Sequence, residues 1–234
     1  MKPAQILATV LATAILAAAP AALADPAAMI AKSEKVKLKG RKGEKLTRPG
    51  YELAEYSGVF SASTFQGSDS LGIWAKAKTA FDFTITRPGW SAPVTGACGG
   101  GQGRLGLGWI TFKRDNLQVT CTFGGSAPAN AAFSLALADG SFLQKLAQPQ
   151  RAAELQYGSV NLRAETRVLG GLPIGGGGPV GYLFTKGDEE VGGIQLAGFQ
   201  PSFYLPPQPS ADRDAAAITA MILFLFKDPG RPER

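Results

Sequence analysis

The sequence contains no histidine and only two cysteines, and these low counts limit the catalytic mechanisms and metal sites that the protein can have. Histidine is the base in Ser-His-Asp and Cys-His catalysis and the commonest metal ligand, so its absence excludes those mechanisms and the usual zinc sites. No serine is followed by a lysine three positions later, which excludes the Ser-x-x-Lys nucleophile pattern as well. These absences predict no cofactor and no metal, and they favour a non-enzymatic protein.

The two cysteines, Cys98 and Cys121, are predicted to form one disulfide, because an even pair in an exported chain is normally oxidised. The bond would close a loop of roughly 20 residues and stabilise the fold by roughly 3 kcal/mol. Two reduced, buried thiols are the alternative. The export signal of the N-terminus favours the disulfide.

Residues 1–24 have the pattern of a cleaved signal peptide. Lys2 supplies a positive start, residues 6–23 are apolar except for small polar interruptions, and small residues at 22 and 24 precede Asp25. We therefore expect a periplasmic or secreted protein. An uncleaved signal anchor is the alternative, since the apolar run is nearly long enough to span a bilayer.

The positive charge is concentrated in a basic arm, residues 25–49. The whole chain carries +6; without Lys2 the mature chain carries +5, and the part outside the segment 32–48 carries about −1. We predict binding contacts from six residues of the arm: Lys35, Lys37, Lys39, Arg41, Lys42 and Lys45. The expected partner is an anionic lipid, an acidic envelope polymer or another envelope protein. Nucleic acid is not expected, because the arm lacks aromatic residues for base stacking. A solvated tether is the alternative.

The segment 210–228 predicts a buried C-terminal helix. Ser210 suits an N-cap, and Asp212 and Asp214 suit the positive end of the helix dipole. Residues 215–226 are apolar apart from Thr219, so the helix must be surrounded on all sides. Twelve residues extend only about 18 Å, which is too short for a bilayer core of about 30 Å. A buried strand and a membrane segment are the less favoured alternatives.

Between residues 50 and 205 the chain alternates short strand patterns with turn residues. Phe81, Phe83 and Ile85 alternate with polar residues, and similar patterns recur up to Pro206. We count about twelve strands, with one β-rich domain over 50–230 and a disordered tail over 231–234. The predicted fold class is mainly β: an antiparallel barrel or rolled sheet around one buried hydrophobic C-terminal helix. A β-sandwich with a packed C-terminal helix is the alternative.

The C-terminal stretch resembles the end of the tubby C-terminal-like superfamily, which includes tubby, phospholipid scramblase and LURP-one-related proteins. The resemblance lies in the hairpin 180–196, in residues 201–206 and in the apolar run that follows Asp212. It implies a twelve-stranded barrel around a hydrophobic helix. Tubby proteins bind phosphoinositides through basic surface residues, and we match none of those positions here. Members are mostly intracellular, whereas this chain carries an export signal.

Two other functions remain open from the sequence. A carboxylate-based hydrolase would use a pair among Asp82, Asp115, Glu154 and Glu165, although surface carboxylates are the commoner case. A carrier of an apolar ligand would hold it in the barrel or a cleft, which Trp74, Trp90 and Trp109 could line.

Three further patterns favour ordinary loops. The acidic residues 188–190 suit a solvated hairpin turn better than a calcium site. The glycines of 101–106 match the dinucleotide fingerprint by letter, but a strand pattern follows where a helix is required. The glycines at 175–178 lack the Gly-Lys-Ser/Thr that would complete a phosphate-binding loop.

Overall fold

The computed structural model describes residues 26–40, 50–68, 75–100, 118–137, 151–169, 181–197, 200–208 and 210–226. The predicted signal peptide, the tail 231–234 and the strand expected at 105–112 lie outside these ranges. In the described part of the chain, no helix is long and apolar enough to cross a membrane.

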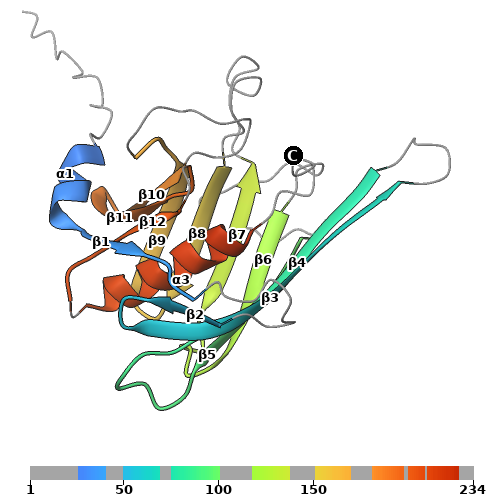
Figure 1. Cartoon of the computed structure of the whole chain (residues 1–234), viewed down its shortest axis with the longest axis horizontal. Helices are drawn as coiled ribbons and strands as arrows, with labels where there is room; N and C mark the ends of the chain where they lie inside the picture. Colours follow the sequence, from blue (N-terminus) through green and yellow to red (C-terminus); the bar gives the residue numbers. More distant parts are fainter. Residues whose placement is uncertain are drawn as a thin grey trace, which may run out of the picture.

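Twelve antiparallel strands form one sheet that curls into a nearly closed barrel (Figure 1). From β2 to β12 each strand pairs with the next one along the chain, and β1 pairs with β12. The predicted barrel is confirmed, and the sandwich alternative is not. The strands are β1 (Glu34–Lys37), β2 (Gly50–Leu53), β3 (Tyr56–Ser68), β4 (Ala75–Ile85), β5 (Val94–Gly100), β6 (Gln118–Gly125), β7 (Ala132–Leu137), β8 (Arg151–Tyr157), β9 (Val160–Thr166), β10 (Gly181–Lys186), β11 (Glu189–Gln195) and β12 (Ser202–Leu205).

The barrel closes where the first strand meets the second. Just beyond β1, Lys39 and Glu52 exchange two backbone hydrogen bonds of 2.9 Å each, which joins the β1 end of the sheet to β2. We call this junction the seam. Val36 and Leu38 pack against the core from the inner side of the seam. Part of the predicted basic arm is therefore barrel wall, and the expected division at residue 49 does not separate β1 from the domain.

Helix α3 (Ala211–Leu225) lies inside the curled sheet (Figure 1). Ser210 caps it as predicted, because its Oγ accepts a hydrogen bond of 3.1 Å from the backbone N–H of Arg213. Every residue from 215 to 223 is buried, and the helix contacts β8, β9, β11 and β12. The side chains of one apolar helix thus occupy the barrel interior along its length.

The disulfide joins two strands at directly opposed positions. Cys98 on β5 and Cys121 on β6 are register partners with Cα atoms 4.0 Å apart, and both side chains belong to the inner core. The predicted pairing is therefore present. Strand β5 itself was not predicted, because Val94–Gly100 consists mostly of small residues and glycine. The predicted alternation of Phe81, Phe83 and Ile85 lies in strand β4, which begins earlier, at Ala75.

A second, smaller apolar cluster lies on the outer face of the sheet. Helix α1 (Pro26–Lys32) crosses β10 to β12 there (Figure 1) and buries Met29. Met29 joins Leu169, Leu183 and Tyr204, each at most 4 % exposed. The cluster attaches the N-terminal end of the described chain to the barrel, which holds β1 in place.

Candidate functional site

Three of the six predicted contact residues form a row on the outside of the barrel seam. Lys35, Lys37 and Lys39 alternate with the inward-facing Val36 and Leu38, and all three lysines are exposed. Alternate residues of a strand lie about 6.8 Å apart, so the row presents three ammonium groups in a line. We call this set the lysine row. Arg41, Lys42 and Lys45 lie outside the described residues.

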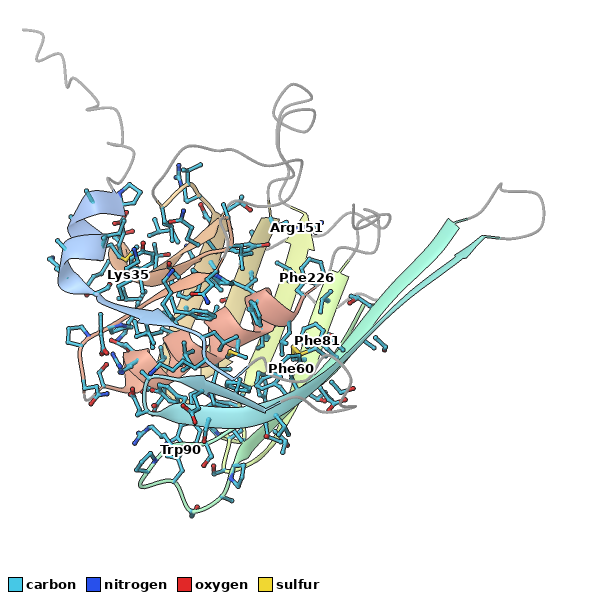
Figure 2. The ribbon with its side chains drawn as sticks, in the orientation of Figure 1. Lys35, Phe60, Phe81, Trp90, Arg151 and Phe226 are labelled. Carbon is cyan, nitrogen blue, oxygen red and sulfur yellow. A yellow bond between two sulfur atoms is a disulfide. The ribbon has the colours of Figure 1, made fainter. Side chains whose placement is uncertain are left out.

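The surroundings of the lysine row leave its charge largely uncompensated. Lys35, labelled in Figure 2, is exposed and lies with its Nζ 5.8 Å from the ring centroid of Tyr204 on β12. The flanking strand β12 contributes no charged residue, and β2 contributes one acid, Glu52, which is exposed and opposite Lys39. The row is therefore a positive stripe, and its net positive charge is lowest at Lys39, which faces Glu52.

Behind the lysine row, a buried arginine holds the seam together from inside. The side chain of Arg213 is 1 % exposed. Its Nε and Nη2 donate to the two carboxylate oxygens of Glu55 at 2.6 and 2.9 Å, and Nη2 also donates to Glu34 at 2.7 Å. Glu34 begins β1, and Glu55 lies in the turn between β2 and β3. The first turn of α3 thus connects both sides of the seam, and we call these three residues the seam latch.

The latch shifts the pKa values of Arg213 and Glu55 in the directions expected of a strong ion pair. Burial acts to lower the pKa of Arg213, but the hydrogen bonds that it donates to Glu55 and Glu34 outweigh burial and the pKa rises. Burial acts to raise the pKa of Glu55, but the bond from Arg213 prevails and the pKa falls. A lowered carboxyl pKa contributes stability above the usual pKa of glutamate, and this is lost as pH falls through the lowered value.

The acids of the first turn of α3 are also paired. Asp214 accepts bidentate hydrogen bonds of 2.7 and 2.9 Å from Arg87 and a third hydrogen bond of 2.7 Å from the hydroxyl of Tyr56. Asp212 accepts bonds of 2.8 and 3.1 Å from Lys186. The sequence assigned these acids to the helix dipole, and the structure adds that they fasten the helix start to β3, the β4–β5 connection and β10.

The tryptophans do not line a common site within the described chain. Trp90 lies half-buried in the β4–β5 connection, with Arg87 stacked 5.2 Å from its ring and Tyr56 edge-on at 6.2 Å. Figure 2 places it at the end of the barrel opposite Arg151 and Phe226. Trp74 and Trp109 lie outside the described residues, as do the glycine segments 101–106 and 175–178. Trp90 therefore serves the packing around the start of α3.

Three of the four carboxylates considered for hydrolysis lie on the outer face of the sheet. Asp82 on β4 and Glu165 on β9 are exposed, whereas Glu154 on β8 is 5 % exposed. Asp115 lies outside the described residues. Within the described ranges, no group of three His, Cys, Asp or Glu side chains could hold a metal ion, and residues 188–190 form part of the β10–β11 turn region.

Of the three described carboxylates, Glu154 on β8 and Glu165 on β9 form the pair that lies on adjacent strands. Glu154 is opposite Arg163, two residues from Glu165 along β9, and its Oε1 accepts a bond of 2.9 Å from Asn161. Glycoside hydrolysis requires two carboxyls that flank the scissile bond. Glu154 is 5 % exposed whereas Glu165 is exposed, so within the described chain only one of the two carboxyls is open to a substrate.

Sequence reasoning missed the seam latch. The single signal was Arg213, a basic residue at the start of an otherwise apolar helix, which must find acids when the helix is buried. Its partners are distant in sequence and become identifiable only once β1 and β2 are known to adjoin. Comparisons with protein families, with curated proteins and with solved structures found no match to this chain.

Proposed function

We propose that this protein is an exported, non-enzymatic binding module whose lysine row contacts an anionic surface, either lipid headgroups or an acidic envelope polymer. The observation that carries the proposal is that three lysines project in line from the barrel wall, two from β1 and one from the bridge to β2 just beyond it. A rigid row loses less conformational entropy on binding than a free tether does. The remaining predicted contacts, Arg41, Lys42 and Lys45, follow β1 directly in the chain.

Two other features support the proposal. The buried disulfide suits an oxidising compartment outside the cytoplasm, which agrees with the pattern of residues 1–24. The filled interior leaves the outer surface as the place for contacts, because the apolar helix α3 occupies the room that a carried ligand would need. Membership of the tubby-like superfamily stays a prediction and does not carry the proposal.

Replacing Lys35 and Lys37 by glutamine is expected to weaken binding to phosphatidylcholine vesicles that contain phosphatidylglycerol by about 30-fold, since each lysine near an anionic surface contributes about 1 kcal/mol. Raised salt should weaken binding of the unaltered protein in the same way. Glu52→Gln should strengthen binding, because it removes the acid opposite Lys39. Vesicle co-sedimentation measures all three effects.

A matched control removes the same charge elsewhere. Arg163→Gln with Arg167→Gln on and beside β9 should leave vesicle binding unchanged. Parallel measurements with alginate distinguish an acidic polymer from a lipid as the preferred surface. Salt-insensitive binding, or equal losses in the lysine and arginine variants, would contradict the proposal.

A further inference from the structure

Strand β3 carries a long free edge. Its pairing with β2 ends at Gly50 and Val59, while its pairing with β4 continues to Ser68 and Ala75. In the described chain nothing pairs with the other edge of β3 from residue 60 to residue 68. Figure 1 shows this part of the β3–β4 hairpin extending away from the barrel, and among the described residues no strand lies along its β3 edge.

The sequence of this edge lacks the usual protection against strand pairing. Residues 60–68 read Phe-Ser-Ala-Ser-Thr-Phe-Gln-Gly-Ser, with no charge and no proline. Natural edge strands are normally blunted by lysine, proline or a bulge. Residues 75–79 of β4, which in the described chain pair with β3 alone, do contain Lys76 and Lys78. The β4 edge of the hairpin therefore carries lysines that disfavour pairing with another strand, whereas the β3 edge carries no charge.

We propose that the free edge of β3 pairs antiparallel with the same edge of a second copy, forming a two-fold symmetric dimer through a continuous sheet. An uncharged edge can meet itself without bringing like charges together, which a lysine-bearing edge cannot. Nine paired residues would add about eight to ten backbone hydrogen bonds, because alternate pairs exchange two bonds each.

The geometry of the hairpin permits this pairing. Antiparallel pairing centred near residue 64 places residue 60 of one copy opposite residue 68 of the other, so each barrel adjoins the hairpin end of its partner. The lysines of the two β4 strands would be separated by three strand spacings, about 14 Å, which exceeds the screening length of about 8 Å at physiological salt. Neither the barrels nor the charges need overlap.

The test uses charge at two positions of the free edge, Ser61 and Ser63, which are half-buried and exposed respectively. Light scattering after size exclusion should give the unaltered protein twice the mass of one chain. Ser61→Lys with Ser63→Lys should give one chain, and so should Ser61→Glu with Ser63→Glu, because the two copies of residue 63 then place like charges about 8 Å apart across the two-fold axis. An equimolar mixture of the two variants should recover the twofold mass.

A control places the same lysines on a strand that is paired on both sides. Thr95→Lys with Ala97→Lys on β5 should keep the dimer, since both positions are exposed and away from the free edge. Recovery in the mixture separates edge pairing from a folding defect. A single-chain mass for the unaltered protein at its highest soluble concentration overturns the proposal, as does a dimer that persists in both charged variants.

Discussion

Replacing Ile222 with aspartate is expected to leave no folded protein. Ile222 is 0 % exposed on α3 and belongs to the apolar core cluster of the barrel interior, where a carboxylate would be removed from water. An uncompensated buried charge costs several kcal/mol, to which the lost packing adds about 2–5 kcal/mol. The sum approaches the whole stability of a typical domain, about 5–15 kcal/mol.

The measurement is circular dichroism with urea unfolding, beside two controls. Ile222→Val removes one methylene and should cost only about 0.5–1.5 kcal/mol. Thr95→Asp places the same charge on an exposed outer position, opposite the uncharged Thr84 and Gly124, and should have little effect. A soluble, cooperatively folded Ile222→Asp protein would mean that α3 does not fill the barrel.

Replacing Arg213 with methionine is expected to lower the free energy of unfolding by about 3 kcal/mol. Removing one partner of a buried ion pair typically costs about 3–5 kcal/mol, and the lower end applies because the partners keep some contact with water. The side chain of Glu55 is 21 % exposed and that of Glu34 is 52 % exposed. Urea unfolding of the variant measures the loss.

A double-mutant cycle separates the latch from general packing. Glu55→Gln alone should destabilise, and adding it to Arg213→Met should cost little more, with a coupling energy of about 1–3 kcal/mol. Glu34→Gln should have a smaller effect because that side chain is more exposed. Additive losses from Arg213 and Glu55, or an Arg213→Met protein as stable as the original, would show that the latch does not hold the seam.

Periodicity predicted the parts of this fold that one local pattern determines. The apolar run 215–226 has no polar face, which favours a buried helix over a buried strand or a membrane segment, and Ser210 marks its start. The alternation of Phe81, Phe83 and Ile85 likewise identified an inward-facing strand. Strand β5 was not predicted, because Gly96, Gly99 and Gly100 have no side chains that could show an alternating pattern.

The candidate site was predictable only in part, because it depends on pairing between distant segments. The excess of lysine between residues 32 and 48 identified the residues of the row. Their common orientation follows from β1 pairing with β12, more than 160 residues later in the chain. The free edge of β3 depends on where β2 begins, at Gly50. In the sequence Gly50 follows Pro49, which lacks a backbone N–H.

The most direct test of the central claim is residue-resolved hydrogen exchange at two amides. The account places the lysine row on a barrel wall that encloses α3, so the amide of Lys39, bonded to Glu52 at 2.9 Å, belongs to the same folded unit as the amide of Ile222. Both amides should exchange more than about 100-fold more slowly than in a free peptide. Protection of Ile222 with free-peptide exchange at Lys39 would contradict the account, since the lysines would then lie on a loose arm.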